Sequence, residues 1–159
     1  MYNRSMKSSI AAFKYGARKE YGRYYAVELA KKHESWIKKT GAQALIPVPI
    51  HKERHKKRGY NQAEILAREL GKRTGIAVCT DRLLRIRNTR PLKLFDRKER
   101  MEVLQGAFAV RSSSDFPENI LLIDDIYTSG STMEHAAGIL KRAGVQNVYF
   151  LTVSIGQER

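Results

Sequence analysis

The residues with the clearest chemical signature are two adjacent acids, Asp124 and Asp125, followed by a short stretch of small hydroxylated residues. The stretch runs from Thr128 to Thr132 and contains Gly130. Adjacent carboxylates can accept hydrogen bonds from the vicinal hydroxyls of a ribose, or hold a divalent cation through oxygen. Hydroxyls and backbone N–H groups of the following stretch can converge on a phosphate. These residue types in this order predict a site for a phosphorylated sugar.

The segments on either side of this stretch have patterns that would position it. Residues 120–123 form a continuous apolar run, which is typical of a strand buried on both faces. A helix is expected afterwards because apolar residues recur at helical spacing, at Met133, Ala136, Ala137, Leu140 and Ala143. The N-terminus of that helix would direct its dipole at a bound phosphate. The alternative is purely structural, a strand with an acidic end followed by a capped helix.

The densest basic segment is residues 51–58, which read His-Lys-Glu-Arg-His-Lys-Lys-Arg. Such a run can meet pyrophosphate, or the backbone of single-stranded DNA. We interpret Lys56 and Lys57 as a solvated face. His51 and His55 could share a metal ion only on a helix, and no third ligand is near them, so we predict no metal site here.

The amino-acid composition is typical of one globular domain with a strong positive charge. The chain has 159 residues, of which 42% are hydrophobic and 29% charged, and Lys and Arg exceed Asp and Glu by 30 to 16, which gives a net charge of +14. A field of this sign attracts polyanions. There is no apolar run of the ~20 residues that a membrane span needs, and no pattern of a signal peptide at the start. Cys79 is the single cysteine, which excludes an internal disulfide and a four-thiolate zinc site and favours a reducing cytoplasm.

Strand patterns alternate with helix patterns, which predicts an α/β fold with a mostly parallel sheet flanked by helices. Residues 5–39 read as helical, with Gly16 and Gly22 as candidate breaks. Further helices are expected after an Asn61 cap, with Glu64 as its capping-box partner, and over 97–104. Residues 50–60 are expected to form a basic loop. Strands are expected at 44–50, 76–79, 83–86, 108–110, 120–123 and 148–153.

Two sets of motifs resemble known families. The segment 120–132 resembles the phosphoribosyl pyrophosphate motif of type I phosphoribosyltransferases. Further matches are similar to the ComF family of competence-associated phosphoribosyltransferase-like proteins, namely Pro47-Val48-Pro49, Arg54, Arg58-Gly59-Tyr60-Asn61-Gln62-Ala63, Lys14-Tyr15 and Gly106-Ala107-Phe108. This resemblance covers nearly the whole chain. It implies a type I phosphoribosyltransferase fold over residues 41–159, with an N-terminal helical segment, 1–40, packed on it.

The resemblance also implies a ligand and roles for individual residues. The ligand is phosphoribosyl pyrophosphate with Mg²⁺. Asp124 and Asp125 would be the catalytic pair that holds the ribose or its metal, and no other protein ligand to the metal is implied. The 5′-phosphate would be held by Thr128, Ser129, Gly130, Ser131 and Thr132. Pyrophosphate contacts would come from Val48, Pro49, Arg58 and Arg97, the last within a loop, 87–100, that closes over the substrate.

The sequence departs from the family in two places and leaves two functions open. Many members carry a zinc ribbon with paired cysteines that has no counterpart here, and Leu92 and Val103 stand where the family usually has glutamine and asparagine. One implied function is transfer of a phosphoribosyl group to an unidentified acceptor, together with DNA uptake in natural competence. The alternative is a non-catalytic factor that binds single-stranded DNA and competence proteins such as a helicase. In either case we expect a cytoplasmic protein without membrane insertion.

Overall fold

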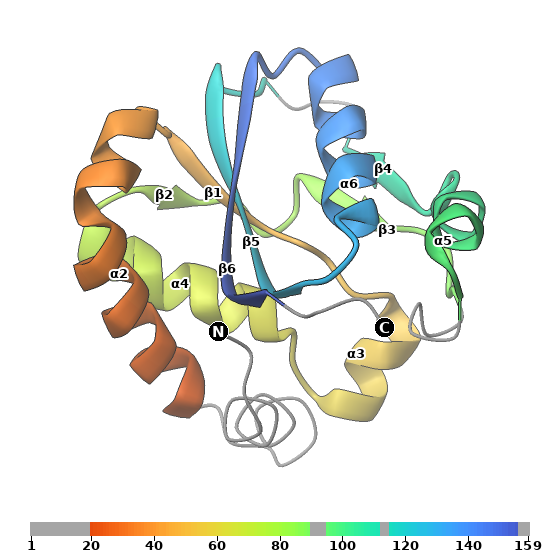
Figure 1. The fold of residues 1–159 in the computed structure, drawn as a ribbon, viewed down its shortest axis with the longest axis horizontal. Helices are drawn as coiled ribbons and strands as arrows, with labels where there is room; N and C mark the ends of the chain where they lie inside the picture. The colour runs from red at the N-terminus through yellow and green to blue at the C-terminus, as the bar shows by residue number, and fades with distance from the viewer. Residues whose placement is uncertain (1–19, 90–94, 112–114, 156–159) are drawn as a thin grey trace.

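The computed structural model describes residues 20–89, 95–111 and 115–155. Its helices are α2 (Glu20–Thr40), α3 (Lys52–Arg58), α4 (Gln62–Thr74), α5 (Arg97–Leu104) and α6 (Ser131–Arg142). Its strands are β1 (Ala44–Pro47), β2 (Ala77–Val78), β3 (Leu83–Arg85), β4 (Phe108–Val110), β5 (Asn119–Tyr127) and β6 (Asn147–Ile155). Figure 1 shows their arrangement.

Four strands form a parallel sheet in the order β2-β1-β5-β6. Leu121 of β5 is in register with Leu45 of β1 on one side and Tyr149 of β6 on the other. Strands β3 and β4 pair antiparallel in a separate two-stranded sheet. The predicted α/β fold with a mostly parallel, helix-flanked sheet is therefore confirmed, and it is consistent with a phosphoribosyltransferase-like fold.

Both faces of the parallel sheet are covered (Figure 1). Helices α2 and α4 pack on one face, where Leu121 and Ile123 of β5 join the core. Helix α6 and the β3–β4 sheet pack on the other face, against Ile120 and Leu122. Successive strand residues point to opposite faces, so a strand covered on both sides is apolar without interruption. Each of these four side chains is fully buried, which stabilises the fold by about 1.5–3 kcal/mol apiece.

The basic segment forms a helix where a loop was predicted. Helix α3 begins after His51, whose Nδ1 accepts a hydrogen bond from the Glu53 N–H at 3.4 Å, and ends at Gly59, which has a φ of 79°. The basic residues of its last turn suit the negative end of the helix dipole. The sequence pattern did not predict this helix because the helix has no apolar face, and the structure likewise buries none of its residues.

Two smaller expectations were wrong. Gly22 does not break the first helix but lies buried inside α2, because a glycine costs only about 1 kcal/mol in a helix whose other residues pack on the core. Gly16 lies outside the described residues. Asn61 caps α4 as expected, but Glu64 pairs with Arg68 at 2.8 Å rather than completing a capping box.

The expected helix over 97–104 and the strand over 108–110 are confirmed as α5 and β4. Helix α5 carries the capping box, in which the Asp96 carboxylate accepts from the Glu99 N–H and the Glu99 carboxylate accepts from the Asp96 N–H, both at 2.8 Å. In the part of the chain that the structure describes, no helix is long and apolar enough to span a bilayer.

Candidate functional site

The two acids lie near the carboxyl end of β5, the central strand that carries the apolar run. The strand continues past them to Tyr127 instead of ending at residue 123, because pairing with β6 persists through Asp124 and Thr152 and ends at Tyr127 and Ile155. Asp124 is half-buried, whereas Asp125 is only 6% exposed. The Asp125 N–H donates to Asp124 Oδ1 at 2.8 Å, which orients the first carboxylate.

The small-residue stretch forms a tight connection between β5 and α6. Gly130 is the N-cap residue of α6 with a φ of 78°, and no side chain caps this helix end. The hydroxyls of Ser129 and Ser131 lie 2.9 Å apart. A Cβ at position 130 would lie 2.5 Å from the Tyr127 hydroxyl oxygen, so the phenol ring is folded back over the glycine. Backbone N–H groups at an uncapped helix start can bind an anion.

The end of β1 lies directly beside the end of β5. The Val48 N–H donates to the Ile123 carbonyl at 2.9 Å, which places residue 48 next to the acids. The Val48 carbonyl in turn accepts from Asn61 Nδ2 at 3.0 Å, while Asn61 Oδ1 accepts from the Ala63 N–H at 3.1 Å. One buried asparagine therefore caps α4 and holds the turn that contains Pro49.

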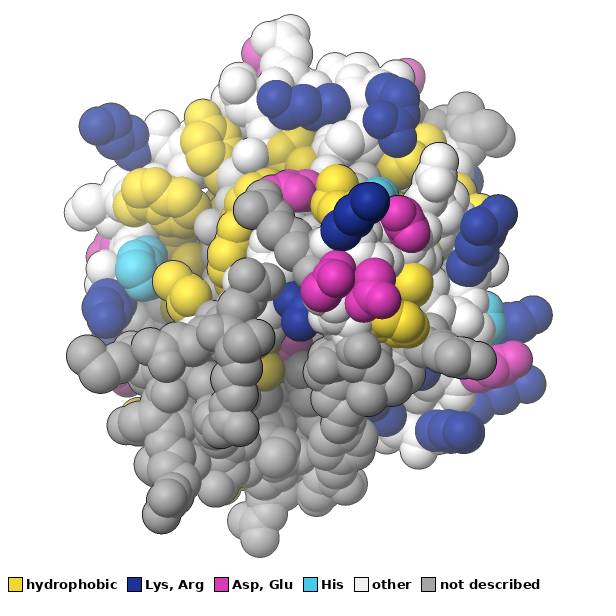
Figure 2. All heavy atoms as spheres, turned by 45° about the vertical axis from the view of Figure 1, so that its right-hand side comes forward, with side chains coloured by type: hydrophobic (Ala, Val, Ile, Leu, Met, Phe, Trp, Pro, Cys, Tyr) yellow, Lys and Arg dark blue, Asp and Glu magenta, His cyan; other side chains and the backbone are white. Residues whose placement is uncertain are grey.

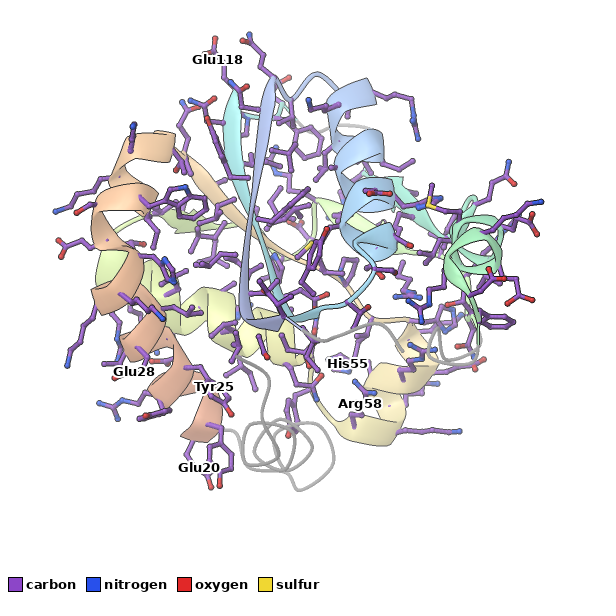
Figure 3. The ribbon with its side chains drawn as sticks, in the orientation of Figure 1. Glu20, Tyr25, Glu28, His55, Arg58 and Glu118 are labelled. Carbon is purple, nitrogen blue, oxygen red and sulfur yellow. The ribbon has the colours of Figure 1, made fainter. Side chains whose placement is uncertain are left out.

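Of the two arginines predicted to contact pyrophosphate, the structure describes the side chain of Arg58 but not that of Arg97. Arg58 lies half-buried in the last turn of α3 and donates to Gln62 Oε1 at 3.2 Å, which links α3 to α4. Figure 3 shows α3, with His55 and Arg58, at the end of the molecule where β5 and β6 terminate. Arg97 is the first residue of α5, and its side chain lies outside the described part of the chain. The same holds for residues 90–94 of the expected closing loop, Leu92 included.

Sequence reasoning missed a cluster of two arginines and a threonine beside the acids. Arg54 Nη2 donates to the Thr89 carbonyl, and Arg85 Nη2 donates to the Thr89 hydroxyl, each at 2.6 Å. The Arg85 guanidinium also lies 5.3 Å from the centre of the Phe108 ring. No sequence signal marks Arg85, because its place depends on how the β3–β4 sheet packs. Arg54 belongs to the basic run 51–58 and to the family resemblance, but neither pattern indicated its contact with Thr89.

This cluster interacts electrostatically with Asp124 of the acid pair. Burial first, and then the charge of the nearby Arg54, lower the pKa of Arg85 to about 10, while the charge of Asp124 acts in the opposite direction. Arg85 therefore lies within electrostatic reach of Arg54 and Asp124. Asp124 is also two strand positions beyond Leu122, on the sheet face that the β3–β4 sheet covers.

The side chains at this site suit a cation that arrives with its ligand. Among the described residues, no cluster of three or more His, Cys, Asp or Glu side chains could hold a metal ion by itself. Mg²⁺ commonly binds through one or two carboxylates together with substrate phosphates and water. The Asp124–Asp125 pair fits that mode, and it does not form an all-protein cage.

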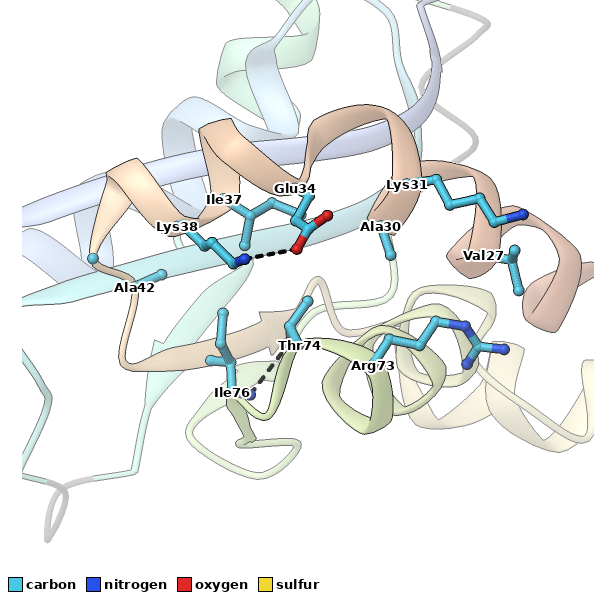
Figure 4. Close-up of a pocket in the computed structure, with 11 residues that line it drawn as sticks. Val27, Ala30, Lys31, Glu34, Ile37, Lys38, Ala42, Arg73, Thr74 and Ile76 are labelled. Atoms are coloured by element: carbon cyan, nitrogen blue, oxygen red, sulfur yellow. Dashed lines mark hydrogen bonds and ion pairs between the residues drawn. The ribbon is translucent and has the colours of Figure 1, made fainter.

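A separate groove of about 550 Å³ lies between α2 and the end of α4 (Figure 4). Its wall includes Ile37 and Ile76, and Lys38 on its rim pairs with Glu34 at 2.6 Å. The groove adjoins residues 41–42, which precede β1, so it is at the opposite end of the parallel sheet from the acids. It therefore belongs to a different part of the surface.

Comparison with known proteins places the chain in a family. The chain is 32% identical over 108 residues to competence protein F of Haemophilus influenzae, across 67% of this chain and 47% of that protein. It is 30% identical over 148 residues to competence protein ComFC of Bacillus subtilis, across 90% of this chain and 56% of that protein. The chain belongs to the ComF family. No protein-family model matches it.

Other relatives extend the comparison without changing it. ComFC of Streptococcus pneumoniae is 30% identical over 151 residues, across 92% of this chain and 62% of that protein. A DNA utilization protein of Salmonella typhi is 29% identical over 107 residues, across 65% of this chain and 45% of that protein. This ComF-family chain therefore spans about half to three-fifths of the length of these relatives.

Proposed function

We propose that this chain binds phosphoribosyl pyrophosphate together with Mg²⁺ at the carboxyl ends of β1 and β5, and that it works in DNA uptake or utilisation. One observation carries the binding proposal. The central strand delivers the Asp124–Asp125 pair and turns through Gly130 into α6, whose N-terminus has no side-chain cap. In parallel sheets, ligands bind at this end of the strands.

The proposed roles follow from the chemistry of each group. The carboxylates of Asp124 and Asp125 accept hydrogen bonds from the ribose hydroxyls. Residues 128–132 hold the 5′-phosphate with their N–H and hydroxyl groups. Mg²⁺, when bound, offsets part of the pyrophosphate charge. Phosphoribosyl transfer is the reaction class that such a site supports, through positioning and charge stabilisation: an acceptor nucleophile bonds to ribose C1 as the bond from C1 to pyrophosphate breaks and pyrophosphate leaves.

The role in DNA uptake or utilisation rests on the relatives, which are named as competence and DNA utilization proteins. A second candidate function, binding of single-stranded DNA, is favoured by the net charge of +14. Helix α3 presents exposed His55, Lys56 and Lys57 in its last turns. On the face shown in Figure 2, basic side chains spread over the top and right of the described surface, and acidic ones gather near the centre.

A thermal-shift experiment tests the sugar-phosphate site. A ligand at about 100 times its Kd stabilises the folded state by about 2.7 kcal/mol, which raises the Tm of a chain of this size by about 5–10 °C. We expect a shift of this order with phosphoribosyl pyrophosphate and Mg²⁺. Thr132→Val, which removes a hydroxyl at the start of α6, should reduce it.

Thr74→Val is the matched control for Thr132→Val. It deletes the same hydroxyl, but at the end of α4, where the group donates to the Leu70 carbonyl at 3.0 Å. This variant should shift with ligand as the wild type does. A wild-type protein whose Tm does not respond to millimolar phosphoribosyl pyrophosphate with Mg²⁺ would contradict the proposal.

A further inference from the structure

One edge of the parallel sheet has no role in the function proposed above. Strand β6 lies at the end of the strand order and, among the strands that the structure describes, pairs only with β5. In Figure 1 it crosses in front of β5, with α2 on one side and α6 on the other. We propose that this edge joins two copies of the chain, whose β6 strands pair antiparallel about a two-fold axis.

The outer edge of β6 presents backbone groups that another strand can bind. The Asn147 N–H donates to the Glu118 carbonyl, on the β5 side, at 2.8 Å. Peptide groups alternate in direction along a strand, so the N–H and C=O groups of Val148, Phe150 and Thr152 point away from β5. No strand within the described part of the chain pairs with them. Such a row of groups is a template for a further strand.

Strand β6 lacks the features that commonly protect the edge of a sheet, namely charges, proline, bulges or a very short strand. Its nine residues include no charged side chain and no proline, in a chain of which 29% is charged. Its register with β5 is constant over its whole length, so it contains no bulge. The other edge of the same sheet is β2, which has only two residues. Of these two edges, β6 is the one that can hold a further strand over several residues.

Apolar side chains flank this edge on both faces of the sheet. On the face covered by α6, Phe150 is 37% exposed. On the face covered by α2, the ring of Tyr149 meets Trp36 edge to face, with ring centres 6.3 Å apart, and Trp36 is 39% exposed. A strand added at this edge would bring its own side chains against these rings. Burial of such apolar surface is the main driving force for association.

The charge distribution favours a second copy as the added strand. Two chains that each carry a net charge of +14 repel each other, so they approach most easily where the surface itself is uncharged. Strand β6 meets this condition, and a different partner attracted by the positive charge would instead need basic side chains along the edge. A two-fold axis at Phe150 would place Val148 opposite Thr152 of the second copy and the two Phe150 rings opposite each other. This contact is self-complementary, as a two-fold interface must be.

The proposed pairing is independent of the sugar-phosphate site. Antiparallel pairing directs the carboxyl ends of the two sets of parallel strands in opposite directions. The two acid pairs would therefore lie at opposite ends of a joined sheet of eight strands, twice the four of one copy. Failure of ligand binding would leave the pairing standing, and failure of pairing would leave the ligand site standing.

Light scattering coupled to size-exclusion chromatography, over a concentration series, tests the proposal. The wild type should reach twice the monomer mass. Phe150→Lys places two like charges opposite each other and should raise the Kd of the dimer at least about tenfold. Met101→Lys is the matched control, because Met101 is 39% exposed on α5, beyond α6 from β6 (Figure 1), and it should dimerise as the wild type does. Circular dichroism verifies that both variants are folded.

The salt dependence of the dimer tests the uncharged edge. Raising the salt concentration from about 0.05 to about 0.5 M screens the repulsion between the two positive copies, so it should lower the Kd of the dimer. A dimer held together by ion pairs would respond in the opposite direction. A dimer that weakens as salt is added would therefore overturn the proposal.

Hydrogen exchange at high and low protein concentration locates the contact. The amides of Phe150 and Thr152 should exchange more slowly where the dimer forms, and those of β2 should not change. A dimer without this protection, or one that Phe150→Lys leaves intact, would overturn the proposal. A wild type that stays monomeric would also overturn it. In that monomer, slow exchange of the same amides would show that another segment of this chain covers the edge, and fast exchange would leave the edge open to a different protein.

Discussion

At the scale of single residues, Gly130 decides whether the phosphate stretch can form. Its φ of 78° lies in the left-handed region, and the Tyr127 hydroxyl occupies the space that a side chain would need. The residue type could be anticipated from the sequence, as the glycine that lets backbone approach a phosphate. The position of Tyr127 could not, because it depends on how far β5 continues beyond the acids.

Gly130→Ala is expected to destabilise the protein by about 1–2 kcal/mol and to weaken binding of ribose 5-phosphate, because a side chain is strained at this φ and displaces Tyr127. Gly75→Ala is the matched control, since Gly75 has a φ of 74° with nothing within 4 Å of the added Cβ. It should cost stability but leave binding intact. Calorimetric titration and chemical unfolding measure the two effects. Equal ligand affinities for both variants would argue against the role of Gly130.

Arg85 shows how a buried charge can reduce stability. Its pKa falls to about 10 in the folded protein, first through burial and then through Arg54. Below pH 10 the arginine is charged in both the folded and the unfolded state. The free-energy cost of burying its charge is therefore fully present at neutral pH. This cost is relieved only as the pH rises above about 10, where the folded state releases the proton before the unfolded state does.

Arg85→Met is therefore expected to raise the Tm of the ligand-free protein at pH 7 by about 2–4 °C, the effect of about 1 kcal/mol in a chain of this size. Differential scanning calorimetry of the variant and the wild type at pH 7 checks the sign of this change. A variant that is less stable than wild type without ligand would show that the contacts to Thr89 and Phe108 outweigh the cost of the charge.

At the scale of elements, the site depends on how β1, β5 and α4 are joined. Asn61 connects them, because one amide caps α4 and holds the Val48 carbonyl. The helix cap was predictable from the sequence, since asparagine before an amphipathic run is a common start signal. Its second bond was not, because Val48 is 13 positions away and meets Asn61 only in the folded sheet.

Asn61→Asp separates the two tasks of this residue. The aspartate keeps an acceptor for the Ala63 N–H, but it loses the donor to the Val48 carbonyl and places a buried charge against that oxygen. Hydrogen exchange should remain slow in α4 and become faster over residues 48–51, with weaker pyrophosphate binding. Asn61→Ala, which removes both bonds, should accelerate exchange at both places. Unchanged exchange over 48–51 in the aspartate variant would contradict the proposed role of the second bond.

Other elements show where sequence patterns succeed. The apolar run 120–123 predicted a strand buried on both faces, and helix α5 was predicted with its observed bounds. Helix α3 was missed because its stability comes from capping and charge placement at the helix end, without an apolar stripe. The acids of the motif could be predicted from their types and order, whereas the Arg54–Arg85 pair arises only when α3 and β3 meet around Thr89.

At the scale of the whole molecule, the net charge of +14 governs encounters with polyanions. This charge acts on free phosphates, sugar phosphates and DNA alike, so it cannot identify the ligand. Specificity must come from groups at defined positions. A sugar phosphate would be recognised by the acids and the small-residue stretch, and a DNA backbone by exposed cations such as those of α3. The two kinds of binding should therefore respond to different substitutions.

Charge reversal on α3 tests the contribution of this helix to DNA binding. Lys56→Glu combined with Lys57→Glu should weaken binding of an oligothymidylate and reduce the slope of log K against log salt by about 1.4, or about 0.7 for each lost phosphate contact. The same reversal at Lys31 and Lys32, which are exposed on α2, should change the slope much less. Fluorescence anisotropy over a salt series measures both, and equal slopes for the two double variants would exclude α3 as the contact surface.

The most direct test of the account is calorimetric titration of phosphoribosyl pyrophosphate into the wild type and into the Asp124→Asn, Asp125→Asn double variant, with and without Mg²⁺. We predict Mg²⁺-dependent binding by the wild type with a Kd in the micromolar range, about −8 kcal/mol. The double variant should lose this binding while its affinity for single-stranded DNA is unchanged. A wild type that does not bind phosphoribosyl pyrophosphate, or a double variant that binds it equally well, would contradict the central claim.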